Sequence, residues 1–266
     1  MYAFEYHSAR STDDARRAFE GFADARYLAG GQTLLASLKM RLAQPDALVD
    51  LGRIPDLSGI RSFESTHLIV GAMTTHAEVA ASDEVRRAIP ALTTLAGGIG
   101  DPMVRHQGTV GGSLANNDPA ADWPSALLAL DGAVVTDRRR MGADDFLLGL
   151  FTTALEPGEL IRSIEFRRPS RAAYMKFKHP ASRFALVGVF VADFDGSVRV
   201  AVTGAAACAF RCVPLEEALT RSFSPDAVRE VHIDDSDFNT DLQATAAYRA
   251  NLVRVMASRA VSHILR

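Results

Sequence analysis

Short apolar runs alternate with amphipathic stretches along the first part of the chain. The run Tyr27 to Ala29 is apolar and ends at a glycine pair, which predicts a strand and then a turn. Leucines spaced four residues apart predict a helix over 33–42 with one apolar face. Pro45 ends this helix, and the apolar run 47–51 predicts the next strand.

The same alternation continues through the middle of the chain. The runs 60–63 and 67–72 predict a pair of strands after a turn-rich segment. Thr75 and Glu78 have the spacing of a capping box, which predicts a helix start. Three more elements are predicted: a helix over 82–96 ending at Gly97-Gly98, a helix over 122–132 with Asp122 at its N-cap, and a strand over 160–166.

The last hundred residues have a different pattern of elements. The polar, proline-containing segment 167–171 predicts a domain boundary. Strands are then predicted over 173–178, 184–193 and 198–207, the last two joined by an Asp195-Gly196 hairpin. An amphipathic helix is predicted from about Leu242 to the end. The pattern as a whole is that of an α+β chain.

Composition removes several classes of function. With a net charge of −3 and no basic stripe, the 266-residue chain does not resemble a nucleic-acid-binding protein. It has no secretory signal and no long apolar run, so we expect a cytoplasmic protein without a membrane span. Its two cysteines are too few for an iron–sulfur cluster, and no histidine pair has the spacing of a metal site.

Two glycine pairs carry the candidate chemistry. The first lies in the segment 29–35, where a predicted strand meets a helix, and the second lies in the segment 108–115. Paired glycines let backbone N–H groups approach a phosphate closely. A simple turn or helix cap explains such a pair equally well, and neither segment has the Rossmann or P-loop spacing.

Longer sequence motifs around these glycines resemble those of the medium subunit of the carbon monoxide dehydrogenase and xanthine dehydrogenase family. The resemblance runs along nearly the whole chain. The motifs that carry it are AGGQTLLASLKMRL (29–42), LVDL (48–51), IGDPMVRHQGTVGGSL (99–114), DPAAD (118–122), FTTAL (151–155), YMK (174–176), ASRFALV (181–187) and AYR (247–249).

The resemblance implies a site for FAD bound without a covalent link. Both glycine loops would bind its diphosphate, and the threonines of the 73–75 segment would line the same cleft. The implied contacts are Ala29, Gly30, Gly31, Gln32, Thr33, Thr74, Thr75, Thr109, Val110, Gly111, Gly112, Ser113, Asp122 and Lys176. Helix capping accounts equally well for Thr75 and Asp122, and Lys178 competes with Lys176 for the place beside the isoalloxazine.

The sequence departs from the family pattern beside the second glycine pair. His106 and Asn116-Asn117 stand where the family commonly has other residues, which leaves the flavin's potential and its electron acceptor open.

The resemblance also implies an architecture and an assembly. It predicts a two-subdomain FAD-binding fold of the vanillyl-alcohol-oxidase/PCMH type over 1–168, with subdomains of about 1–55 and 56–168. A C-terminal flavoprotein domain over 171–266 would follow. Molybdopterin and [2Fe-2S] clusters would reside on a large and a small partner subunit, in a dimer of heterotrimers.

The predicted function is electron transfer by FAD from the partner's clusters to an external acceptor. The sequence leaves two alternatives. One is a stand-alone flavin reductase of the same fold, for which the chain shows no cluster of acid, base and nucleophile. The other is an assembly subunit that has lost its flavin, which the intact glycines disfavour.

Overall fold

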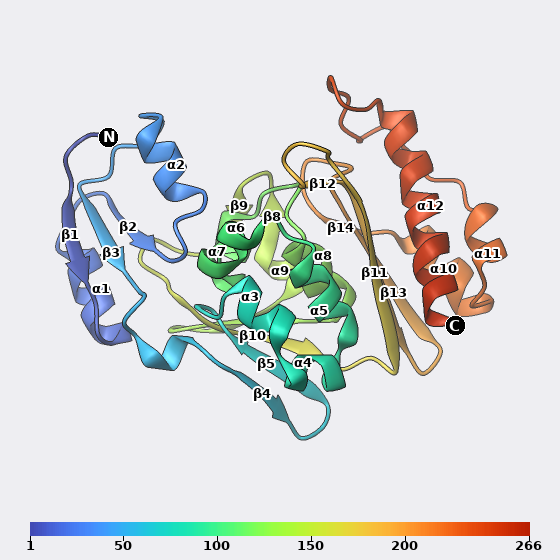
Figure 1. Ribbon diagram of the computed structural model, residues 1–266, viewed down its shortest axis with the longest axis horizontal. Coiled ribbons are helices and arrows are strands. Elements are labelled where there is room, and N and C mark those ends of the chain that lie inside the picture. Colours follow the sequence, from blue (N-terminus) through green and yellow to red (C-terminus); the bar gives the residue numbers. More distant parts are fainter.

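The computed structural model describes residues 1–266 and contains three main sheets in chain order (Figure 1). The first sheet is parallel, with strand order β1-β3-β2. Its strands are β1 (Glu5–Ser8), β2 (Ala25–Leu28) and β3 (Ala47–Asp50), and its helices are α1 (Thr12–Glu20) and α2 (Leu34–Lys39). The short helix η1 (Pro55–Leu57) leads to the next sheet.

The second sheet is antiparallel, with strand order β4-β5-β10-β6-β7. Its strands are β4 (Ile60–Phe63), β5 (His67–Gly71), β6 (Ala133–Thr136), β7 (Arg140–Gly142) and β10 (Ile161–Arg167). Helices inserted between the strands are α3 (His76–Ala81), α4 (Asp83–Ala88), α5 (Pro90–Gly97), α6 (Pro102–Gln107), α7 (Val110–Asn116), α8 (Trp123–Ala129) and α9 (Ala143–Phe146). A small hairpin, β8 (Leu147–Gly149) and β9 (Thr152–Thr153), follows α9.

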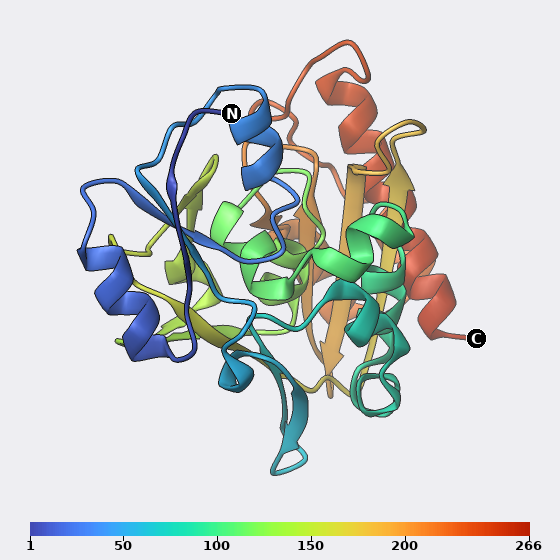
Figure 2. The same cartoon turned by 60° about the vertical axis from the view of Figure 1, so that its left-hand side comes forward.

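The third sheet is antiparallel and lies at the opposite end of the molecule from the first (Figures 1 and 2). Its strands are β11 (Arg171–Lys178), β12 (Ala185–Phe194), β13 (Ser197–Thr203) and β14 (Phe210–Arg211). Three helices follow: α10 (Val213–Arg221), α11 (Pro225–Arg229) and α12 (Ala246–Ile264).

One apolar core joins the second and third sheets. It contains Trp123 of α8, Phe166 of β10 and Phe190 of β12, all fully buried. The other face of the third sheet packs against α12 in a separate core. Helices α8 and α12 pack against the two faces of β12. This strand is therefore buried along its whole length.

The structure confirms the α+β fold and several predicted elements. The strand pair β4–β5 and the β12–β13 hairpin occur where the pattern placed them. At the hairpin turn Asp195 and Gly196 both have positive φ, as a two-residue turn of this kind requires. The capping box is present, since the side chain of each of Thr75 and Glu78 bonds the other's backbone N–H.

Other boundaries differ from the predicted ones. The helix expected over 33–42 spans only 34–39. The helix expected over 82–96 is two helices, because Pro90 cannot donate a helical hydrogen bond and Ile89 leaves the helical conformation. The last helix begins at Ala246 rather than near Leu242.

Candidate cofactor site

The two glycine loops, residues 29–33 and 108–113, lie directly against each other. A Cβ atom added to Gly30 would stand 2.0 Å from the carbonyl oxygen of Gln107 and 2.7 Å from the Cα of Gly108. A Cβ on Gly112 would lie 3.3 Å from the Cβ of Ala29. The structure therefore brings together two segments that are far apart in the sequence, and only glycine fits at the contact.

The first glycine loop presents a run of free backbone donors. No N–H group from Ala29 to Leu34 bonds to a backbone or side-chain acceptor of the chain. Gly31 has a φ of +70°, which turns the backbone within this run. Successive N–H groups around such a turn form a concave site for an anion. This loop fits a diphosphate.

The second glycine loop uses its amides internally, which differs from the expectation that both loops offer backbone donors. The N–H groups of Val110 and Gly111 donate to the carbonyl oxygens of Thr74 (3.0 Å) and Ala72 (2.8 Å). That of Gly112 donates to the Thr109 hydroxyl at 3.1 Å, and Ser113 donates to the Thr109 carbonyl. A Cβ on Gly111 would lie 2.6 Å from that of Ala72, so this glycine serves close packing.

Some side chains of the second loop remain available. The Thr109 hydroxyl accepts from Gly112 but keeps its own proton to donate, and the Ser113 hydroxyl has no partner in the chain. On the first loop, the Gln32 amide reaches only the Gly30 carbonyl, at 3.4 Å, while the Thr33 hydroxyl makes no bond.

The two threonines after β5 are occupied by structural bonds. The Thr74 hydroxyl is buried and donates to the carbonyl oxygen of Gly59 at 3.1 Å. The Thr75 hydroxyl donates to the Glu78 carboxylate at 2.8 Å and accepts from the Glu78 backbone. Helix capping thus explains Thr75, and neither hydroxyl is left as a free donor.

Asp122 and Lys176 form a buried ion pair between the segment before α8 and strand β11. The Lys176 ammonium lies 2.8 and 2.9 Å from the two carboxylate oxygens of Asp122, and it also donates to the carbonyl of Gly98. The Tyr174 hydroxyl donates to the same carboxylate at 2.5 Å. Only about 5% of either charged side chain is exposed. Burial raises the pKa of Asp122, and the Lys176 ammonium opposes that rise.

This arrangement corrects the N-cap interpretation of Asp122 and distinguishes the surroundings of the two lysines. Asp122 precedes α8, but its carboxylate makes no N-cap bond because it turns to Lys176 and Tyr174. Lys176 is committed to that carboxylate, whereas Lys178 is exposed and its ammonium stands 3.8 Å from the Cβ position of Gly98. Lys178 is therefore the lysine of this strand that is free to meet a ligand.

His76 was not predicted as part of the site. Its ring is buried, and the Nε1–H of Trp123 donates to its Nδ1 at 3.1 Å. Burial lowers the pKa of His76 to about 4, helped by the charge of Arg105. The chain's only tryptophan follows Asp122 directly, but nothing in the sequence links it to a histidine 47 positions earlier.

The residues that depart from the family pattern have distinct places. Asn117 is buried and left-handed (φ 43°), and its amide donates to the carbonyls of Gly149 and Thr152, both at 2.9 Å. It therefore ties the end of α7 to the β8–β9 hairpin. His106 is exposed in the last turn of α6.

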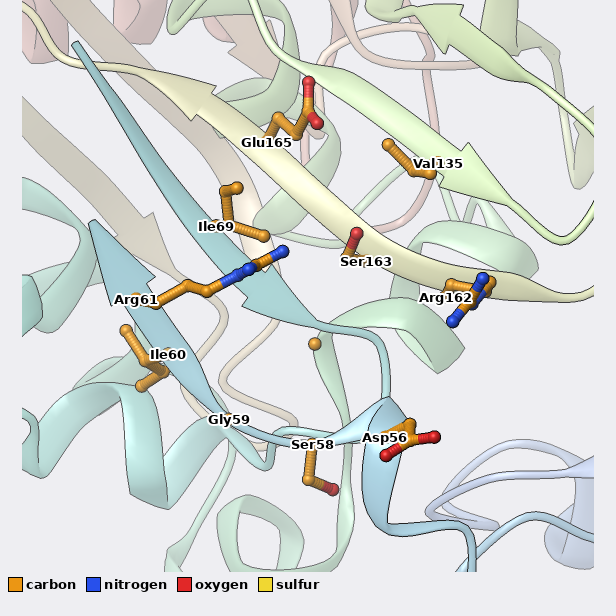
Figure 3. A pocket seen from close by; sticks show the side chains of 11 residues that line it. Asp56, Ser58, Gly59, Ile60, Arg61, Ile69, Val135, Arg162, Ser163 and Glu165 are labelled. Carbon is orange, nitrogen blue, oxygen red and sulfur yellow. The ribbon is translucent and has the colours of Figure 1, made fainter. Parts of the chain in front are cut away.

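One hollow of the surface lies away from the glycine loops. It is a cavity of about 450 Å³ on the second sheet, and its lining includes Arg61, Arg162, Ser163 and Glu165 (Figure 3). A second hollow lies between β1 and α1. No group of three or more histidine, cysteine, aspartate or glutamate side chains is placed to hold a metal ion.

The chain is similar in sequence to a known domain family and to known proteins. The FAD-binding domain of molybdopterin dehydrogenases matches residues 2–168. The nicotine 6-hydroxylase medium subunit of Paenarthrobacter nicotinovorans is 34% identical, covering 97% of this chain and 96% of the relative. The carbon monoxide dehydrogenase medium chain of Hydrogenophaga pseudoflava is 34% identical over the same shares.

Solved structures agree with the sequence relatives. Reconstituted CO dehydrogenase from Oligotropha carboxidovorans superimposes with a TM-score of 0.88 at 31% identity, covering 99% of this chain and 98% of that one. Fold and loops together define an FAD-binding component of an oxidoreductase complex. The chain belongs to the family of FAD-binding subunits of molybdenum hydroxylases, the molybdopterin dehydrogenases. None of its helices combines the length and apolar character that a membrane span requires.

Proposed function

We propose that this chain is the electron-transfer subunit of a molybdenum hydroxylase, carrying one non-covalent FAD between partner clusters and an external acceptor. The observation that carries the proposal is the row of unbonded N–H groups from Ala29 to Leu34, pressed against a second glycine loop. Backbone donors in that arrangement hold a diphosphate whose negative charge they partly neutralise.

The residues of the proposed site have different roles. The first loop's amides hold the diphosphate, with hydroxyls of Thr33, Thr109 and Ser113 as further donors. Asp122 stays in place because Lys176 and Tyr174 fix its carboxylate from the third sheet. Lys178 supplies the free positive charge near the cleft. FAD supplies a carrier that takes two electrons and releases them singly or together. We assign 1–168 to the FAD-binding domain and 171–266 to the C-terminal domain.

The β8–β9 hairpin supports an assembly with other subunits. Leu148, Leu150 and Phe151 are 60, 54 and 57% exposed on this hairpin. Asn117 holds the hairpin rigidly at the end of α7, the helix that the second glycine loop opens. Apolar side chains fixed in this way favour burial against a partner, which we propose to be an iron–sulfur subunit.

The proposal is tested by flavin reduction under anaerobic conditions. The FAD-loaded chain is mixed with the substrate of the whole enzyme, and bleaching of the visible flavin band is followed. We expect no bleaching until the iron–sulfur and molybdenum subunits are added. Bleaching by the chain alone would show a complete flavoenzyme, and a chain that takes up no FAD would show an assembly subunit.

A further inference from the structure

His76 stands behind the contact between the two glycine loops. Its backbone N–H donates to the carbonyl oxygen of Gly108 at 3.0 Å. A Cβ on Gly108 would lie 2.8 Å from Nε2 of the ring and 3.0 Å from Cδ2, so the ring edge faces this glycine directly. Gly108 also meets Gly30, because a Cβ on Gly30 would lie 2.7 Å from the Gly108 Cα. Gly108 thus contacts both Gly30 and the His76 ring.

The ring itself is fixed from the core. Trp123 has no exposed surface and packs against Phe166, with ring centroids 6.0 Å apart. Because its indole N–H can only donate, Nδ1 of His76 must accept and carries no proton. In the neutral ring the proton then resides on Nε2, the atom directed at Gly108. Nε2 has no acceptor among the residues of the chain.

Protonation would break this arrangement. A proton on Nδ1 would face the Trp123 N–H, and a charged ring would be buried near the positive charge of Arg105. The ring is therefore held in one orientation and one tautomer.

We propose that His76 is a positioning residue of the cofactor site: its neutral ring, locked by Trp123, sets the spacing of the second glycine loop from the first. This inference rests on the proposed function only for the identity of the ligand. Trp123 fixes the His76 ring, the ring packs against Gly108, and Gly108 packs against Gly30. The position of the first loop's free amides is therefore set by the core. A ring that moved or shrank would let Gly108 retreat and would open the gap between the loops.

Two substitutions separate this role from simple stability. In His76→Asn the amide oxygen replaces Nδ1 as acceptor for Trp123, but the ring edge that faces Gly108 is lost. In His76→Phe the ring volume stays but the acceptor is removed. His263→Asn, at the exposed end of α12, is the matched control. Phe146→Leu, in the same core as Trp123, controls for destabilisation alone.

The first readout needs no flavin. In the cofactor-free chain, ¹⁵N spectra should show His76 with Nδ1 unprotonated and Nε2 protonated at neutral pH. The amide signals of Gly30 and Gly108 should both shift in His76→Asn and stay in place in both controls. A charged His76 ring, or shifts confined to α3, would overturn the proposal.

The second readout is FAD affinity, measured by titration at equal fractions of folded protein. We expect His76→Asn and His76→Phe to bind FAD about tenfold more weakly than the wild type, and both controls to bind within about twofold. Equal affinity in all variants would refute the positioning role. If the wild-type chain itself bound no FAD, the proposed function would fail, while the Gly30 and Gly108 signals would still decide the role of His76.

Discussion

The buried ion pair between Asp122 and Lys176 allows the sharpest prediction. In Lys176→Met, an unbranched apolar chain of similar length replaces the ammonium. The Asp122 carboxylate then keeps the Tyr174 hydroxyl but loses its counter-charge in a site where it is only 5% exposed. Breaking one side of a buried pair costs about 3–5 kcal/mol. We expect about 3 kcal/mol at neutral pH, because Asp122 can take up a proton instead of remaining charged.

The pH dependence follows from the same carboxylate. Burial already raises the pKa of Asp122, and loss of the ammonium raises it further. A carboxyl group whose folded pKa lies above its unfolded value makes the folded state bind more protons. The deficit of Lys176→Met should therefore shrink as the pH falls from neutral toward the unfolded pKa of an aspartate, near 4.

Urea unfolding at several pH values measures both effects. At a slope of about 3 kcal/mol per molar, the midpoint should fall by about 1 M at neutral pH. The double variant Asp122→Asn/Lys176→Met, which has no buried charge, should recover most of the lost stability. A single variant as stable as the wild type, or a deficit that does not change with pH, would refute the reasoning.

Three further predictions concern other parts of the site. Because His76 has a folded pKa of about 4 and an unfolded value of 6.5, it should cost about 3 kcal/mol of stability as the pH falls through this window, and His76→Asn should show a smaller acid loss in urea unfolding. Asn117→Ala should lower the free energy of unfolding by about 2–3 kcal/mol, because it removes both hydrogen bonds to the β8–β9 hairpin and strains a left-handed residue. Asn117→Gly should lower it less, and thermal unfolding of the two variants checks this order. Gly30→Ala should abolish saturable FAD binding in a folded chain, since its methyl group would overlap the Gln107 carbonyl and force the loops apart; normal affinity would contradict the loop contact.

Local pattern predicted most of the strands but not the helices around the second glycine loop. The strand pair β4–β5 and the hairpin at Asp195-Gly196 are set by alternation and by turn residues, both of which are local. Helices α6 and α7 are short, and their ends are fixed by Asp101 and Thr109 side chains that cap them. With six and seven residues they are too short for a clear helical period, and α7 also contains the glycine pair, which disfavours a helix.

The sequence predicts the two glycine loops of the candidate site but not the contacts that these loops make. The motifs around Gly30 and Gly111 indicate two loops. Only the fold shows that the backbone amides of the first loop are free and that those of the second form hydrogen bonds within the chain. Lys176 and Lys178 are indistinguishable by pattern, and only the fold shows that Lys176 is buried beside Asp122 while Lys178 is exposed. The pair of His76 and Trp123 depends on two segments that meet only in the folded chain.

The first glycine loop is the proposed place where a diphosphate is held. The most direct measurement is a fluorescence titration of the cofactor-free chain with FAD and, separately, with riboflavin, which has the same ring system but no phosphate. We predict saturable 1:1 binding of FAD and binding of riboflavin that is weaker by a factor of at least about 100, since the amides of Ala29–Leu34 would have no anion to hold. Equal affinity for the two ligands, or no saturable binding of FAD, would contradict the central claim.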